Sequence, residues 1–287
     1  HYAKARYGNT NERLMEALRL IMNGIYKPDK MREGCLENII CARPNLDAKK
    51  ASTWSNPHMY YNPKEVETAA RKMLAAGVEM GDSLTSLETY RYDLADLCRQ
   101  VLADRARPQL QRCKEAYAKK DKEAFAQESA AFLQLIRDTA EVLRCTEHFL
   151  LGAYLEGAAN RGTTPADKEA NTRALRQLIT TWRPDISVLN DYAHRQYAEL
   201  MQHYYSERWK AYFELCTAQL EGTATAADLG SAEKQITTNN GEAVEYVNIK
   251  NPRLDAIDTA FATMKLPLLT KPSGDIMQIA DKILNKQ

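Results

Sequence analysis

The chain has 287 residues, of which 44% are apolar and 27% charged, which is ordinary for a globular protein and excludes disordered, collagen-like and low-complexity chains. Its 39 basic residues balance 38 acidic ones, so no overall charge favours nucleic acid or an anionic membrane as a partner. The longest apolar run, from Phe149 to Leu155, is far shorter than the roughly 20 residues of a membrane span. We therefore expect no nucleic-acid partner and no membrane-spanning helix.

The sequence begins at His1, with neither an initiator methionine nor a signal peptide. We therefore expect it to be a piece of a longer protein. It contains no N-x-S/T sequon, which a secreted animal glycoprotein of this length would usually carry. This absence favours a bacterial source.

Six cysteines are present, and none belongs to a C-x-x-C pair. Cys35 and Cys41 flank a short apolar run. A local disulfide between them is one interpretation, but two separate thiols are favoured. The other four lie in helical patterns among apolar neighbours, which predicts small buried side chains: Cys98, Cys113, Cys145 and Cys216.

The apolar residues repeat with a helical period over most of the chain, which predicts an all-α fold. Within residues 1–27, apolar side chains from Leu14 to Ile25 follow the spacing of one helix face, so the first helix is expected there. Residues 28–62 have no sustained period and contain prolines and a glycine. We predict a long ordered loop, a feature that is unusual inside a compact domain and often functional.

Residues 63–221 are predicted to form the main helical bundle. Asn62 followed by Pro63 is a strong helix start, because asparagine caps free amides and proline suits the first helical position. Asp121 is expected to cap a later helix, and Pro108 to kink or restart the helix that contains it. The first expected helices run from Pro63 to about Met80, Leu84 to at least Arg107, Asp121 to Leu143, Glu147 to Ala159, and Pro165 to Thr181.

The longest helix is expected from about Ser187 to Leu220. Aromatic side chains recur every three or four residues from Tyr197 to Phe213, a stripe that is more typical of a core than of a binding platform. Tyr192 would lie about 140° around this helix from Tyr197, so we expect it to face elsewhere.

Residues 222–252 are rich in glycine, threonine, asparagine and alanine, and Asn239-Asn240-Gly241 is a turn signal. We predict a loop or insertion with one short extended segment. Terminal helices are expected within residues 253–287. Together these features predict an irregular multi-helix bundle with one long, aromatic-striped helix and a long N-terminal loop.

The sequence shows no familiar catalytic motif: it lacks a phosphate-binding glycine loop, a G-x-S-x-G elbow and an H-E-x-x-H pair. A zinc site needs three or four convergent ligands, and the five histidines are scattered, so we expect no metal and no other cofactor. A retaining glycosidase needs two carboxyl groups about 5 Å apart. No pair of acidic residues stands out as such a site.

Trp182 is the most suggestive residue, because it lies at the expected corner between two helices. Tyr192 follows ten residues later, at the expected first turns of the next helix. Two flat apolar faces at a corner could contact a sugar ring. The residues alone favour the simpler interpretation, in which both side chains only cover the corner.

At this corner the sequence resembles the C-terminal region of the α-N-acetylglucosaminidases, a family of glycoside hydrolases. The motif W-x-P occurs at 182–184, L-x-D-Y-A at 189–193, and Y-Y followed by R-W at 204–209. Other blocks of the family occur in the same order, and the resemblance covers nearly the whole chain except about 222–252. These blocks are R-Y-G at 6–8, R-Y-D-L-x-D-L-x-R-Q at 91–100 and F-L-L-G-x-x-L-E at 149–156.

The resemblance implies a retaining, exo-acting enzyme that removes terminal α-linked N-acetylglucosamine. It implies a small N-terminal domain, a catalytic (β/α) barrel and an all-helical C-terminal domain, of which this chain would be the last. The family's two catalytic glutamates precede the R-Y-G block, so this chain should lack them and be inactive alone. The family is exported: periplasmic or extracellular in bacteria and lysosomal in animal relatives.

The resemblance also implies partners and site residues. The helical domain leans on its own barrel and walls the N-acetylglucosamine pocket with the residues that correspond to Trp182 and Tyr192. A nearby aliphatic residue contributes, either Val188 or Leu189, because this chain has one extra residue between the two aromatic ones. A stand-alone helical scaffold or protein-interaction module is the alternative, and a carbohydrate-binding module is a third, less favoured one.

Overall fold

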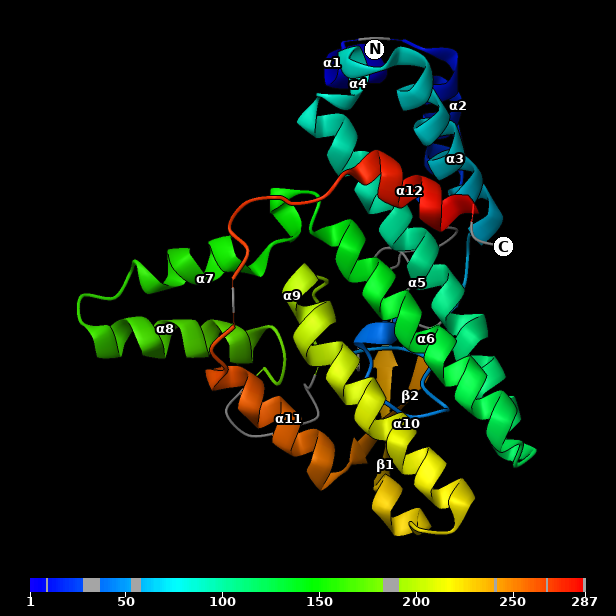
Figure 1. Cartoon of the computed structure of the whole chain (residues 1–287), viewed down its shortest axis with the longest axis vertical. Helices are drawn as coiled ribbons and strands as arrows, with labels where there is room; N and C mark the ends of the chain where they lie inside the picture. The colour runs from blue at the N-terminus through cyan, green and yellow to red at the C-terminus, as the bar shows by residue number, and fades with distance from the viewer. Residues whose placement is uncertain are drawn as a thin grey trace.

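A computed structural model describes most of the chain, in the ranges 1–8, 10–27, 37–52, 58–182, 191–239, 242–266 and 268–285. Helices dominate these residues, which confirms the predicted all-α class (Figure 1). They surround two clusters of buried hydrophobic side chains, one toward each end of the molecule. Helix α5 (Glu88–Ala118) contributes to both clusters and links them.

The first hydrophobic cluster lies among the helices at the end of the molecule that contains the N-terminus. Asn62 caps α3 by accepting a hydrogen bond from the Lys64 amide (3.1 Å), with Pro63 at the first helical position, as predicted. Asn11 caps α2, the helix before the predicted loop, by accepting hydrogen bonds from the Arg13 and Leu14 amides. The elements here are α1 (Tyr2–Tyr7), α2 (Glu12–Asn23), α3 (Pro63–Met80), α4 (Asp82–Thr85), the first half of α5, and α12 (Ile276–Asn285).

Helix α5 continues through Pro108 for 31 residues, so the predicted restart at this proline is wrong. An internal proline removes one hydrogen bond and costs about 3 kcal/mol. Here the flanking residues Ala106 and Leu110 are buried in the second cluster, and we infer that their packing offsets the cost.

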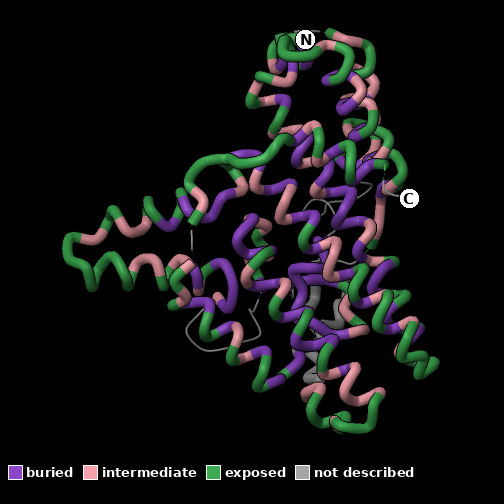
Figure 2. The backbone as a smooth tube through the Cα atoms, in the orientation of Figure 1, coloured by how far each residue is buried: buried purple, intermediate pink, exposed green. Residues whose placement is uncertain are grey.

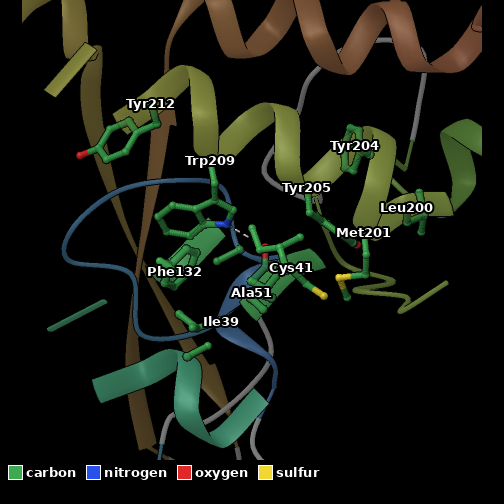
Figure 3. Close-up of a cluster of buried hydrophobic side chains, with 14 of the residues drawn as sticks. Ile39, Cys41, Ala51, Phe132, Leu200, Met201, Tyr204, Tyr205, Trp209 and Tyr212 are labelled. Carbon is green, nitrogen blue, oxygen red and sulfur yellow. Dashed lines mark hydrogen bonds between the residues drawn. The ribbon is translucent and has the colours of Figure 1, made fainter. Parts of the chain in front are cut away.

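The second cluster contains most of the aromatic stripe (Figure 3). Trp209 is fully buried, lies against Phe132 with the ring centroids 4.6 Å apart and the planes tilted by 53°, and donates a hydrogen bond from Nε1 to the Ile40 carbonyl (2.8 Å). The prediction that the stripe is core is therefore confirmed. The elements around it are η1 (Ile39–Cys41), α6 (Lys122–Leu143), α9 (Ala198–Leu200), η3 (Met201–Tyr205), α10 (Ser206–Glu221) and α11 (Pro252–Thr263).

The striped helix begins at Ala198 and is shorter than α5, and its predicted start, Ser187, lies outside the described residues. Residues 191–197 form turns and irregular backbone, and a π-helical stretch precedes α10. The prediction failed because Asp191 adopts a left-handed conformation (φ 60°), which a helix excludes. Tyr192 therefore lies in a turn, and its predicted orientation around a helix is wrong as well.

Residues 222–252 form more regular structure than predicted. After the short η4 (Ala226–Leu229), strands β1 (Ser231–Asn239) and β2 (Glu242–Lys250) pair antiparallel, with Asn239 opposite Glu242. The single extended segment of the prediction is therefore a two-stranded hairpin. The Asn240-Gly241 dipeptide between the strands is a strong hairpin signal in the sequence.

An arm projects from the side of the molecule (Figure 1). It consists of η2 (Glu147–Phe149), α7 (Leu151–Ala159) and α8 (Pro165–Leu178), and α8 is exposed along most of its length (Figure 2). A capping box between Thr164 and Asp167 starts α8. The far end of α8 returns to the main body, where Arg176 is buried and donates to the Met264 carbonyl (2.5 Å).

The thiols are expected to resist alkylation in the folded chain. Burial raises the pKa of Cys98, Cys113 and Cys216 to about 12 and that of Cys145 to about 11. Because the thiolate is the nucleophile, their reaction with iodoacetamide near pH 8 should be about a hundredfold or more slower than that of a free thiol. Peptide mapping by mass spectrometry, with a urea-unfolded control, measures this. Rapid labelling of the folded chain at these positions would contradict the burial.

Two glycine substitutions test the packing between helices. A methyl group at Gly77 of α3 would meet the Tyr90 hydroxyl and Met277, whereas one at Gly157 of α7 meets nothing within 4 Å. Both changes to alanine gain helix propensity. We expect Gly157→Ala to raise the free energy of unfolding by about 0.5–1 kcal/mol and Gly77→Ala to lower it by about 1–3 kcal/mol. Urea denaturation measures both, and equal effects would contradict the close approach at Gly77.

Candidate functional site

The structure brings Trp182 and Tyr192 together at the end of α8. Their ring centroids lie 4.7 Å apart with the planes at 71°, an edge-to-face contact. The Trp182 amide donates to the Gln177 carbonyl (2.7 Å), and the Asp191 amide donates to the Thr180 carbonyl (2.9 Å). The two sides of the corner are therefore tied to the same helix end. Val188 and Leu189, the two aliphatic candidates, lie outside the described residues.

The backbone at this corner is strained. Trp182, Asp191 and His194 all have positive φ values, of 68°, 60° and 32°. Such conformations disfavour residues with a Cβ and persist only where the surrounding structure imposes them. Their concentration beside two aromatic side chains marks the corner as a candidate site.

A buried ion-pair network imposes this conformation. Asp191 accepts two hydrogen bonds from Arg208 of α10, at 2.7 and 2.9 Å, and both side chains are fully buried. Arg208 Nε lies 3.4 Å from Asp258 of α11, which in turn accepts a hydrogen bond from Arg43. Arg43 also pairs with Asp255. The network therefore joins the corner to α10, α11 and the segment before α3.

Burial raises the pKa of the Asp191 carboxyl group above its ordinary value, and the neighbouring Arg208 guanidinium acts in the opposite direction. The Arg208 guanidinium also lies over the Tyr204 ring, 4.8 Å from the centroid. The bidentate contact and the aromatic face offset part of the cost of burying this charge, while Arg208 Nε and Asp258 Oδ1 are buried without a hydrogen-bond partner.

His194 and Gln196 connect the segment after Tyr192 to the N-terminal loop. His194 Nδ1 lies 2.9 Å from the Tyr192 carbonyl and 3.6 Å from the buried Glu37 carboxylate. Asn38 donates to the Gln196 side chain (2.9 Å). The described part of the loop predicted for 28–62 is therefore in direct contact with the candidate site.

A cleft of about 800 Å³ opens beside this segment and begins at Ala193, the residue after Tyr192. Part of its lining is aromatic: Tyr92 stacks on Phe149 at 5.4 Å, and Tyr154 contacts Tyr197 at 5.2 Å. The rest of its lining is mostly polar. Its side chains come from distant parts of the sequence and include Arg6, Asn38, Asp96, Arg99, Gln100 and Gln196.

The acidic residues near the cleft are engaged in ion pairs. Asp93 binds Arg6 and accepts a hydrogen bond from Tyr7 (2.6 Å), and Asp96 binds Arg99 at 2.8 Å. Arg91 lies close in the sequence, but the cations paired with these two aspartates are Arg6 and Arg99. The contacts of Arg6 and Tyr7 with Asp93 hold helix α1 against α5, whereas the pair of Asp96 and Arg99 lies within α5.

His148, expected to be isolated, lies 3.4 Å from Glu88 at the rim of the cleft. Glu88, Glu147 and His148 offer three ligand atoms within 4.8 Å of one another, the one such group found among the described ranges. All three residues are exposed, so the group also fits an ordinary surface ion pair. In the same described ranges, no helix combines the length and the apolar character that a membrane span requires.

Comparisons with known proteins identify what this chain is similar to. The family model of the alpha-N-acetylglucosaminidase C-terminal domain matches residues 1–286. The human alpha-N-acetylglucosaminidase is 25% identical over 287 residues, a match that covers 99% of this chain and 34% of the human protein.

Solved structures of a family 89 glycoside hydrolase from Clostridium perfringens are also similar. The complex with its substrate GlcNAc-alpha-1,4-galactose has a TM-score of 0.82 and 26% identity, covering 98% of this chain and 30% of that one. The complex with PUGNAc has a TM-score of 0.83 and 26% identity, covering 99% and 30%. This chain therefore spans about a third of the length of these relatives.

The stability of the folded chain should depend on the buried pair of Arg208 and Asp191, even when the replacement for Arg208 is also positively charged. Arg208→Lys cannot make both hydrogen bonds to Asp191, and we expect it to lower the free energy of unfolding by about 3 kcal/mol. Arg253 pairs with Glu214 on the surface, where both side chains are about half exposed. Arg253→Lys is the matched control and should cost less than about 1 kcal/mol. Equal losses in urea denaturation would contradict the role of the buried pair.

Proposed function

This chain belongs to the family of alpha-N-acetylglucosaminidase C-terminal domains, and on that basis we propose that it is the helical domain of an exo-acting, retaining α-N-acetylglucosaminidase. In the whole enzyme it packs on the catalytic (β/α) barrel and walls the pocket for terminal α-linked N-acetylglucosamine. The fragment lacks the two catalytic glutamates and is inactive alone.

The observation that carries this proposal is the corner formed by Trp182 and Tyr192. Their rings contact each other at 4.7 Å although ten residues separate them, and Tyr192 remains 37% exposed. A surface tyrosine held by a buried ion pair costs little further entropy when it binds a ligand. This supports a rigid wall that is formed before the sugar arrives.

Each residue has a defined part in the proposed mechanism. Trp182 and Tyr192 present apolar ring surfaces to the C–H face of the sugar, exclude water and fix the orientation of the glycosidic bond. Either Val188 or Leu189 adds an aliphatic contact. Asp191 is a positioning residue, because its bonds to Arg208 hold the turn that carries Tyr192. Proton transfer and nucleophilic attack belong to the barrel, so no cofactor is required.

We further propose that the enzyme is exported from a bacterium, to the periplasm or the extracellular medium. The absence of glycosylation sequons in the sequence supports this. The alternative, a stand-alone helical scaffold or interaction module, is not favoured. The chain matches a C-terminal domain over nearly its whole length, and its relatives are about three times as long.

Substitution of Trp182 in the full-length enzyme tests the proposed wall. We expect Trp182→Ala to lower kcat/KM for p-nitrophenyl α-N-acetylglucosaminide by about tenfold or more, because a large apolar contact surface is lost. Trp182→Phe keeps an aromatic face and should retain more activity. Steady-state kinetics measure the effect, and a melting curve verifies that the variant is folded. Unchanged kinetics in a folded Trp182→Ala enzyme would reject the role.

A further inference from the structure

A pocket of about 540 Å³ lies where the arm meets the segment that follows α11. Its lining comes from α7 and α8, the two helices of the arm (Figure 1), and from residues 262–266 and 268. It shares no lining residue with the cleft beside Tyr192. Its volume is in the range of sites that enclose a small ligand. The proposed function does not use this pocket.

Arg176 lines the pocket, and it is buried without a carboxylate beside it. The residue is only 8% exposed. Its Nη1 donates to the Met264 carbonyl, its guanidinium lies 5.9 Å from the centroid of the Phe261 ring, and its Nε is buried without a hydrogen-bond partner. Burial lowers the pKa of Arg176, and no carboxylate of the described residues counteracts this effect.

The other buried arginines of the described ranges have carboxylate partners. Arg208 binds Asp191, and Arg43 binds Asp258. Taking a guanidinium out of water costs free energy, and a paired anion offsets that cost. A carbonyl and an aromatic face offer only partial negative charge. Arg176 therefore lacks the kind of partner that the other two arginines have, and its place in a pocket allows a ligand to supply one.

The remaining charges of the pocket also favour an anion. Its charged lining residues are four cations and two carboxylates, a surplus of two positive charges: Lys168, Arg173, Arg176, Lys265, Glu156 and Glu169. Apart from Arg176 they are all exposed, and none of them forms an ion pair with another described residue. A positive lining around a buried guanidinium is complementary to a negatively charged ligand.

Two of the exposed cations lie near Arg176. Arg173 is three residues earlier in α8, so the two side chains share a face of the helix. Lys265 follows Met264, whose carbonyl binds Arg176. These cations come from two separate segments and so approach a ligand from different directions. A tetrahedral oxyanion has acceptor oxygens in several directions and can bind all three, and the guanidinium fork suits phosphate-like groups.

We propose that this pocket is an anion site that binds a tetrahedral oxyanion, phosphate or sulfate, through Arg176, Arg173 and Lys265. The ligand supplies the anionic partner that the buried guanidinium lacks. It is either the free ion or an ester that carries the same group. Leu155 and Leu266 also line the pocket, so an ester has an apolar surface for its organic part.

Isothermal titration calorimetry of the full-length enzyme tests this site, with inorganic phosphate, inorganic sulfate and phenyl phosphate as separate probes at constant ionic strength. We expect Arg176→Gln and Arg173→Gln each to raise the Kd of the oxyanion by about tenfold or more, because each removes a charge-assisted contact. Arg161→Gln is the matched control and should leave the Kd unchanged, since Arg161 is exposed between α7 and α8 and does not line the pocket. Tighter binding of phenyl phosphate than of both inorganic ions would identify the ligand as an ester, and the reverse order would identify it as the free ion.

Three outcomes would overturn the inference. The first is that none of the probes binds the wild-type enzyme in a saturable way. The second is an unchanged Kd in Arg173→Gln, a variant at an exposed position that remains informative if Arg176→Gln lowers the melting temperature. The third is an equal loss in Arg161→Gln, which would indicate only the general charge of the arm. Because binding is measured directly, failure here is separate from failure of the proposed function, which would appear in the kinetics of Trp182→Ala.

Discussion

The conformation of the candidate site depends on the buried pair between Asp191 and Arg208. Taking two charges out of water costs several kcal/mol for each ion, and the cost is recovered only where the geometry is close to ideal. Here two parallel hydrogen bonds, a second carboxylate at Asp258 and the face of Tyr204 surround the guanidinium. The turn that carries Tyr192 cannot relax from its left-handed conformation without separating these charges. The ion pair therefore holds the strained turn, and with it the backbone of Tyr192, in a fixed position.

The sequence predicts features that depend on residues close together in the chain, and it misses features that depend on contacts between distant residues. Asn62 and Asp121 cap helices through hydrogen bonds to amides two or three residues away, so the sequence alone locates those helix starts. Asp191 is separated from its partner by 17 residues, and Arg43 from Asp258 by 215. The aromatic stripe begins only at Tyr197, and the sequence does not reveal that Asp191 binds a distant arginine in a backbone conformation outside the helix.

The candidate site was predictable in part. Its two aromatic residues follow from the motifs around 182 and 192, and the core role of the other aromatic residues follows from their helical spacing. The cleft could not be found in this way, because the chain brings together side chains as distant as Arg6, Tyr92, His148 and Gln196. Their contacts are with residues far away in the sequence: Arg6 binds Asp93, Tyr92 stacks on Phe149, and Gln196 accepts from Asn38. The signal exists only in the packing of α1, α5, η2 and the turn after Tyr192.

The hydrogen bonds and ion pairs of the carboxylates that line the cleft indicate what this helical domain can contribute to an enzyme. A general acid or nucleophile needs a carboxyl group that is available to the substrate. In the described part of the cleft, Asp96 is bonded to Arg99, and Glu37 accepts hydrogen bonds from the Ala51 and Ser52 amides at 2.7 and 2.8 Å. These carboxylates are committed to holding helices and loops in place. The same bonds that make them unsuitable for chemistry keep the walls of the cleft and the Trp182 corner fixed, and fixed surfaces bind a sugar without a further ordering cost. Under the proposed function, the contribution of this domain to catalysis is the position in which it holds the substrate.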